Sequence, residues 1–346
     1  MFGGDEVKKE QHRFQWLGFG VASIVVHIVG ISLLIMSISE YPAILGLGIV
    51  AYTLGLRHAF DADHIATIDN TVRKLVQQKQ DASGVGFFFS LGHSSVVFLM
   101  TLALGLSVRW AQKHMPMFEH IGGTIGATVS GIFLVIIGMI NLMILVDLRK
   151  LFIRMKHDPY DHLALEKLLD QRGFMSRLFR PLFSFVSRSW HVYPLGFLFG
   201  LGFDTASEVA LLALSAGAAK SAMPFIGILS LPLLFAAGMN IMDTADGIFM
   251  THAYKWAFHT PIRKVYYNIT VTAVSVAAAF LIGFVELAQV SKATFHLEGA
   301  FWNWLGGLDL GYLGYGLVII LLGSWFVSVV IWKVFRIEEK WMNHRT

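Results

Sequence analysis

The sequence predicts an all-α membrane protein, a polytopic helical bundle of about eight transmembrane helices that forms a single domain over residues 1–346. The chain is 55% hydrophobic and only 14% charged, whereas a soluble protein carries about 25% charged residues. Its mean hydropathy is +0.62. Apolar runs of about twenty residues, enough for a helix to cross a bilayer, recur along the sequence.

Eight apolar runs account for the predicted spans. They are residues 17–38, 43–60, 84–108, 121–146, 192–217, 223–250, 267–290 and 310–335. The first run is longer than the core of a signal peptide and lacks a convincing cleavage site, so we expect it to be retained. The second run is short and loses its hydrophobicity near residue 57, so we expect this helix to break or tilt there.

The basic residues predict the orientation of the bundle. If both termini are cytoplasmic, the outer loops hold few of the 27 Lys and Arg residues: Arg109, Lys113, Lys220 and Lys292. Cytoplasmic loops carry the excess of basic residues in membrane proteins, so this distribution favours cytoplasmic termini. The formal charge of +4 therefore reflects orientation in a bilayer and predicts no nucleic-acid partner.

The longest segment between the runs, residues 147–191, is expected to be a basic amphipathic loop in the cytoplasm. Residues 161–169 have the spacing of an amphipathic helix, and several arginines follow among Phe and Leu. A helix lying on anionic lipid headgroups is the expected structure. A regulatory or partner-binding role is the alternative, although the sequence indicates no obligatory protein partner.

A polar motif, residues 57–67 with the sequence RHAFDADHIAT, interrupts the second run. A charged side chain near the bilayer centre costs about 2.5–3.5 kcal/mol, so such a cluster predicts a function. Imidazole and carboxylate ligands suit a first-row divalent metal ion, and the chain has no cysteine for a thiolate site or a disulfide. On a continuous helix, four of these polar residues would share one face: Arg57, His58, Asp61 and His64.

His58, Asp61 and His64 are therefore predicted metal ligands. Arg57 is expected to pair with Asp61 when no metal is bound, because an isolated buried charge is costly. Asp63 would lie on the other side of a continuous helix, either as a ligand or as a cap that supports the ligands. A structural ion-pair cluster at a helix end is the alternative for the whole motif.

Polar residues in three other runs are predicted to bind the metal or to line its pathway: His93 and Ser94, Asp204 and Glu208, and Asn240, Asp243 and Asp246. For the histidine, a hydrogen bond to a backbone carbonyl is the alternative. Two carboxylates four residues apart in a helix cannot both stay charged cheaply without a cation or a shared proton. The three polar residues of the sixth run are expected to face the bundle interior.

Four further polar residues are expected to be structural. Asp69 and Asn70 are predicted to lie in a turn at the inner surface of the membrane. Asn141 and Glu286 are single polar groups within apolar runs, and we expect them to form hydrogen bonds between helices.

Short stretches of the chain repeat. Residues 55–61 are similar to residues 200–204, and residues 92–94 are similar to residues 238–240. The predicted orientation makes the corresponding spans run in opposite directions. The chain is therefore expected to contain an inverted repeat, an arrangement in which transporters bind their substrate near the membrane midplane.

Four motifs resemble the signature sequences of the nickel/cobalt transporter family: residues 57–65, 89–97, 201–208 and 238–243. The resemblance extends over nearly the whole chain. It implies an eight-span secondary importer of Ni²⁺, and sometimes of Co²⁺, in the cytoplasmic (inner) membrane of a bacterium. It also implies that His58, Asp61, Asp63 and His64 are the main metal-handling residues.

Transport rather than enzymatic catalysis is the expected activity, with the dication as substrate and no prosthetic group. The membrane potential favours entry of a divalent cation by about 4.6 kcal/mol per 100 mV, and proton exchange at Asp204 and Glu208 would add a second driving force. An importer of Mn²⁺ or Zn²⁺ is the alternative within this class, because such ligands do not single out nickel. A membrane metalloenzyme and a metal sensor are the alternatives outside it.

Overall fold

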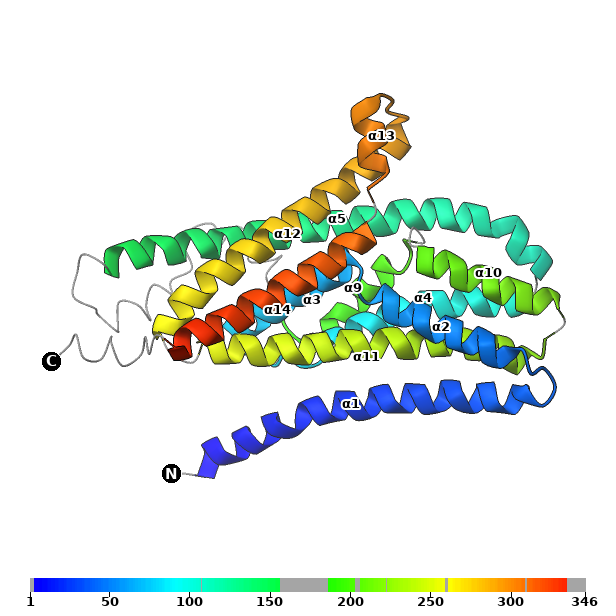
Figure 1. The fold of residues 1–346 in the computed structure, drawn as a ribbon, viewed down its shortest axis with the longest axis horizontal. Coiled ribbons are helices and arrows are strands. Elements are labelled where there is room, and N and C mark those ends of the chain that lie inside the picture. Colours follow the sequence, from blue (N-terminus) through cyan, green and yellow to red (C-terminus); the bar gives the residue numbers. More distant parts are fainter. Residues whose placement is uncertain are drawn as a thin grey trace.

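The structure, a computed structural model, describes residues 3–106, 108–155, 186–202, 206–221, 223–258, 261–308 and 310–334. These residues are helical apart from short turns, and no strand occurs among them. The long helices lie roughly along one direction and form an elongated bundle (Figure 1). The predicted all-α class is confirmed.

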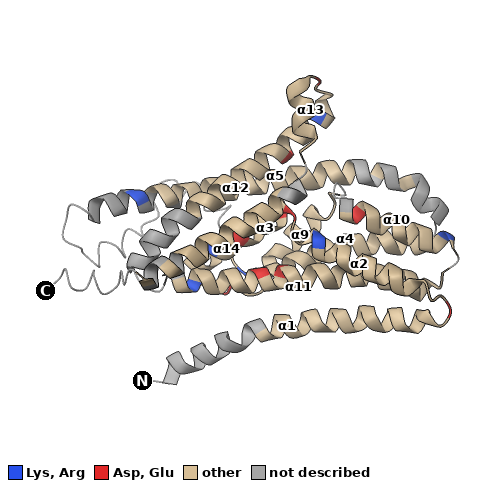
Figure 2. Cartoon of the chain, viewed as in Figure 1, with Lys and Arg blue, Asp and Glu red and all other residues tan. Residues whose placement is uncertain are grey.

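The helices of the first half of the chain are α1 (Gly3–Ile38), α2 (Ile44–His58), α3 (Ala62–Gln77), α4 (Val85–Leu106) and α5 (Val108–Met155). Those of the second half are η1 (Ser189–His191), α9 (Val192–Phe199), α10 (Ala206–Lys220), α11 (Phe225–Phe258), α12 (Pro261–Phe295), α13 (Ala300–Gly306) and α14 (Leu310–Val334). Charged residues are sparse along these helices (Figure 2).

Five helical stretches are long and apolar enough to cross a membrane: Leu17–Ile38, Val85–Leu106, Ile121–Met143, Phe225–Trp256 and Thr272–Phe295. The other three predicted spans coincide with α2, with α9 followed by α10, and with α14. The fold is therefore that of a polytopic membrane bundle. The predicted loop 147–191 begins inside α5, which continues to Met155, and residues 156–185 lie outside the described part of the chain.

Two of the spans are interrupted, the second at its end after His58 and the fifth between α9 and α10. The first break separates α2 from α3, and Asp61 there has an extended backbone with φ −64° and ψ 144°. The second break follows α9, where Gly202 N–H donates to the carbonyl of Phe199 at 2.8 Å before α10 begins at Ala206. The expected break in the second span is confirmed, and the fifth span breaks in the same way.

Glycines bring helix backbones into contact on both sides of the bundle. Gly55 of α2 lies against the carbonyl of Phe235 in α11, and Gly238 of α11 lies against that of Tyr52. In α4 and α9, Gly92 and Gly196 make the same kind of contact. A Cβ atom at any of these four glycines would overlap a backbone oxygen of the facing helix, so the close crossings require glycine.

Two pairs of helices from the two halves of the chain run antiparallel. Helices α4 and α11 run antiparallel, because Gly86 faces Asp243 whereas Gly105 near the other end of α4 faces Phe225. Helices α5 and α12 also run in opposite directions, as their colours show in Figure 1, and they cross where Gly131 meets the backbone of Gly283. Spans three and four thus run opposite to spans six and seven, as the expected repeat requires, and the inverted repeat itself stays a prediction.

Helix α3 is the most enclosed element of the bundle. All of its residues from Ala62 to Val76 are buried except Asp63, and α4, α5, α11, α12 and α14 pack around it. The placement of Asp69 and Asn70 in a surface turn was therefore wrong. The charged residues of this segment suggested a solvent-exposed surface, but the surrounding helices supply polar partners for them within the bundle.

Candidate metal centre

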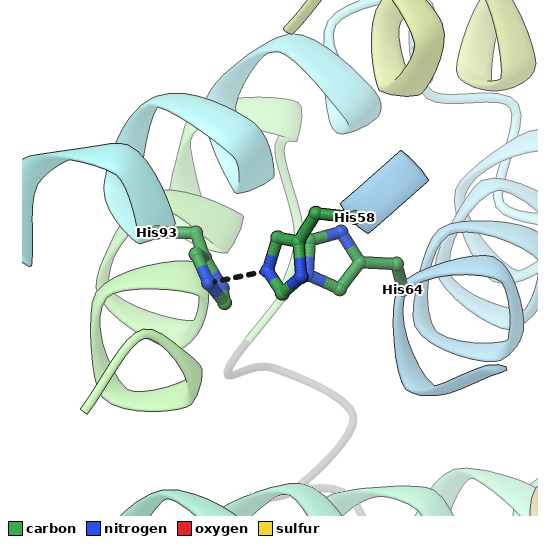
Figure 3. A group of neighbouring side chains, drawn as sticks. All are labelled: His58, His64 and His93. Atoms are coloured by element: carbon green, nitrogen blue, oxygen red, sulfur yellow. Dashed lines mark hydrogen bonds between the residues drawn. The ribbon is translucent and has the colours of Figure 1, made fainter. Parts of the chain in front are cut away.

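Three histidines meet where the second span breaks (Figure 3). His58 is the last residue of α2, His64 lies in the first turn of α3, and His93 lies in α4. All three are buried, and one nitrogen atom from each lies within 4.8 Å of the others. The break makes this possible, because it turns His58 and His64 toward each other with ring centroids 4.8 Å apart.

The closest approach joins Nε2 of His58 to Nε2 of His93 at 2.9 Å. One imidazole must donate and the other accept in this contact, so at least one of the two nitrogens presents a lone pair. Metal–nitrogen bonds to histidine measure about 2.1 Å. Two such ligands at a right angle around one ion would lie about 3 Å apart, which is the separation found here.

Each histidine also has a carboxylate neighbour. Asp61 Oδ2 lies 3.2 Å from His58 Nδ1. Glu208 Oε1, from the first turn of α10, lies 2.8 Å from His93 Nε2. Asp243 Oδ2, from α11, lies 3.3 Å from His64 Nδ1. The carboxylates can orient the rings and offset the charge of a bound cation.

The cluster has unused coordinating capacity. His64 Nε2 and His93 Nδ1 are buried and have no hydrogen-bond partner among the described residues. A buried polar atom without a partner costs about 1–3 kcal/mol, which coordination of a cation would offset. A cavity of about 10 Å³, enough for about one water molecule, lies beside the cluster; its polar lining residues are His58, Asp63, His93, Ser130 and Glu286.

The helix ends around the centre add to its electrostatics. The carboxyl ends of α2 and α9 and the amino ends of α3 and α10 lie at the two breaks. Amino ends carry a partial positive charge that stabilises carboxylates, and the acidic residues of these first turns are Asp63 and Glu208. Carbonyl groups at carboxyl ends favour cations. Broken helices are used in this way at ion sites of transporters.

Half of the predicted site residues converge on this cluster. Contacts join these six: His58, Asp61, His64, His93, Glu208 and Asp243. Asp63 lies at the edge of the cluster, where it borders the cavity and accepts a hydrogen bond from the backbone N–H of His64 at 2.9 Å within the first turn of α3. Asp204 lies outside the described residues.

The expected pairing of Arg57 with Asp61 is not present. Arg57 is exposed, and the Asp61 carboxylate lies 3.2 Å from His58 Nδ1 instead. The expectation assumed a continuous helix, in which residues four apart share a face. Because α2 ends at His58, that spacing no longer holds.

Three predicted pathway residues lie outside the cluster. Ser94 donates to the carbonyl of Ser90 in its own helix at 2.7 Å. Asn240 donates to the carbonyl of Phe87 at 3.3 Å and so joins α11 to α4. Asp246 lies one turn beyond Asp243 in α11, and its atom Oδ2 is buried.

Sequence reasoning missed Glu286 and Ser207 as members of the site. Glu286 is buried in α12 and borders the cavity, although we expected only an interhelical hydrogen bond from it. Ser207 Oγ lies 3.5 Å from His58 Nδ1. A carboxylate within an apolar run is itself a signal of function, and it could have identified Glu286.

The antiparallel helix pairs, the broken helices and the buried histidine–carboxylate cluster define a membrane protein of the transporter class. The family of high-affinity nickel-transport proteins matches residues 44–331, and the chain belongs to this family.

Named relatives extend over most of the chain. The nickel transporter NixA of Staphylococcus aureus is 56% identical over 96% of this chain and 98% of its own length. The nickel transporter NicT of Mycobacterium tuberculosis is 45% identical over 94% of this chain and 92% of its own. The cobalt transport protein NhlF of Rhodococcus rhodochrous is 41% identical over 75% of this chain and 76% of its own. No solved structure gives a significant match.

Proposed function

We propose that this protein imports Ni²⁺, and also Co²⁺, across the cytoplasmic membrane of a bacterium as a secondary transporter. The observation that carries the proposal is the buried cluster of three histidines and three carboxylates at the breaks of two membrane spans. The family and the names of its relatives support nickel and cobalt as substrates.

In the proposed site, His58, His64 and His93 are ligands of the transported ion. Imidazole nitrogen binds first-row divalent ions well. Asp61, Glu208 and Asp243 lie within 3.3 Å of the histidines, so they orient the rings and compensate the charge of the dication. The ion exchanges its water ligands for these groups. Its positive charge offsets the free-energy cost of burying several carboxylates in an apolar bundle.

The membrane potential supplies a driving force. A divalent cation that moves to the negative side gains about 4.6 kcal/mol per 100 mV, and this gain permits uphill import without ATP. Cytoplasmic termini are part of the proposal. The first residues of α1 and the last residues of α14 lie toward the same end of the bundle (Figure 1), as an even number of crossings requires.

The test is uptake of radiolabelled nickel into liposomes that contain the purified protein, with cobalt, zinc and manganese as competitors. We expect an inside-negative potential to drive accumulation, and we expect cobalt to compete more strongly than zinc or manganese. Collapsing the potential and the pH gradient separately identifies the driving force. Accumulation of manganese or zinc in preference to nickel, or of no metal at all, would contradict the proposal.

A further inference from the structure

A second buried polar cluster lies apart from the metal centre and joins α3, α11 and α12. Arg73 Nη2 donates to Tyr254 Oη at 2.6 Å and to Asp69 Oδ2 at 3.3 Å, and it also donates to Ser275 Oγ. The hydroxyl of Tyr254 donates in turn to Asp69. All four side chains are buried, and the guanidinium carbon lies 5.0 Å from the centre of the tyrosine ring.

This cluster lies on the two helices that leave the metal centre on one side. On α3, Asp69 and Arg73 follow His64 by about 7.5 and 13.5 Å along the helix axis. On α11, Tyr254 follows Asp243 by about 16.5 Å along the axis. Because Asp243 contacts His64 and Tyr254 contacts Asp69, the two helices run side by side from the centre to the cluster, toward the predicted cytoplasmic face.

Stability alone does not account for such a cluster. Well-packed apolar residues of similar size often replace a buried ion pair without loss of stability. Charged groups within membrane spans more often mark pathways for ions. A pair of opposite charges can also separate and then form again between the same two groups. An apolar contact has no such specific pairing.

The carboxylates on these helices continue from the centre toward the cluster. Asp243 and Asp246 are one turn apart on α11, so Asp246 lies between Asp243, which contacts His64, and Tyr254, which contacts Asp69. Atom Oδ2 of Asp246 is buried without a hydrogen-bond partner among the described residues. A dication that leaves His64 would therefore meet acidic groups in succession, and Arg73 occupies the far end of that route.

We propose that Asp69, Arg73, Tyr254 and Ser275 form the gate that closes the route from the metal centre to the cytoplasm. This inference rests on the proposed function. In the closed state Arg73 ties α3 to α11 and α12, and its positive charge opposes passage of a dication. In the open state Arg73 leaves Asp69, whose carboxylate is then free to accept the ion.

The test uses a single reporter cysteine in a chain that has no cysteine of its own. Thr67 is buried on α3 between the centre and the gate, so Thr67→Cys reports access from the cytoplasm. Its rate of reaction with a charged, membrane-impermeant methanethiosulfonate is measured in inside-out membrane vesicles, without metal. With the gate intact the reaction should be slow.

Tyr254→Phe removes one hydroxyl from the gate, and it should raise the labelling rate about fivefold, the usual effect of one hydrogen bond on an equilibrium. Asp69→Asn removes the charge that holds Arg73 and should raise the rate more. Thr251→Ala is the matched control, because it removes a buried hydroxyl one turn earlier on α11 that bonds only to the carbonyl of Gly247 among the contacts described. This control should leave the rate unchanged.

An unchanged rate in both gate variants would overturn the proposal, as would a rise seen in right-side-out vesicles instead. If Tyr254→Phe fails to reach the membrane, Ser275→Ala gives the same test from α12 with the same expected direction. Nickel uptake by the unmodified protein is measured separately. Failure of that uptake would contradict the proposed function, whereas normal uptake with unchanged labelling would contradict only the gate.

Discussion

The two broken spans have the same architecture but different chemistry. The break between α2 and α3 brings His58, Asp61 and His64 to the metal centre, whereas the break between α9 and α10 brings Ser207 and Glu208. Helix α3 is enclosed and carries the Asp69–Arg73 pair. Helix α10 is built mainly from small apolar residues, and with α2 it borders an open apolar groove of about 640 Å³.

The difference shows that a broken membrane span can contribute different groups to the same cluster in the two halves of the chain. In both halves a broken span places helix ends beside the histidine cluster. Among the described residues of the two broken spans, the imidazoles of the cluster and the charged residues that hold a helix to its neighbours lie in α2 and α3, and α4 adds the third imidazole, His93. The α9–α10 half contributes a carboxylate from a less enclosed helix. The assignment of binding mainly to α2–α3 leads to four predictions.

The largest effect is expected from loss of a histidine in the α2–α3 half. His64→Ala should lower nickel uptake at least about 100-fold, because loss of a ligand should exceed the 10–100-fold cost of losing a supporting group. The protein should still reach the membrane. His252→Ala is the control, since His252 is exposed and bonds to the carbonyl of Ile248 in its own helix. Near-normal uptake by the His64 variant would contradict the proposed role of His64 as a ligand.

A smaller loss is expected from the α9–α10 half. Glu208→Gln keeps the shape of the side chain but removes its charge beside His93, so the KM for nickel should rise about 10–100-fold. Uptake at saturating nickel should fall less. Glu298→Gln, at an exposed position, should change neither quantity. If Glu208→Gln abolishes uptake at every nickel concentration, the two halves are equally responsible for binding.

Changes at the crossing of α2 and α11, just before the first break, should affect the stability of the protein more than its binding of nickel. Gly55→Ala forces α2 away from the backbone of Phe235 and should destabilise the protein by about 1–3 kcal/mol, the usual cost of overpacking. The measurement is the Tm of the purified protein in detergent. At Gly46 in the same helix an added Cβ would meet no atom within 4 Å outside its chain neighbours and its own helix backbone, so Gly46→Ala should leave the Tm unchanged or raise it slightly, because Ala favours a helix over Gly. Equal Tm values for both variants would contradict the crossing.

The smallest effect is expected at Arg57. Its side chain is exposed and does not pair with Asp61, so Arg57→Gln should change nickel uptake less than about twofold, as surface substitutions usually do. Asp61→Asn, measured in parallel, should lower uptake strongly, because Asp61 contacts His58. A large loss of nickel uptake in the Arg57 variant would contradict this expectation and would support the Arg57–Asp61 ion pair that a continuous helix predicts.

Sequence patterns predicted the class of fold and most of the centre. Apolar runs set the spans, because each must satisfy its backbone within a bilayer. Polar residues in those runs marked His58, His64, His93, Glu208 and Asp243, because their burial is costly unless they have partners.

The rest depends on tertiary structure. Helical periodicity placed Arg57 beside Asp61, but the break changed which residues face each other. The charges of α3 resembled those of a surface helix, and only the packing of α11 and α12 shows that Tyr254 and Ser275 satisfy them. Glu286 is distant in sequence from every motif, so only the fold brings it to the cavity.

The glycine crossings have a consequence for movement. They hold α2 against α11 and α4 against α9, so the 2.9 Å contact between His58 and His93 connects one helix pair to the other. Any shift of one pair past the other changes that separation directly. A rearrangement that opens the bundle would thereby pull apart the two histidines proposed to hold the ion, so that its release would follow from the motion itself.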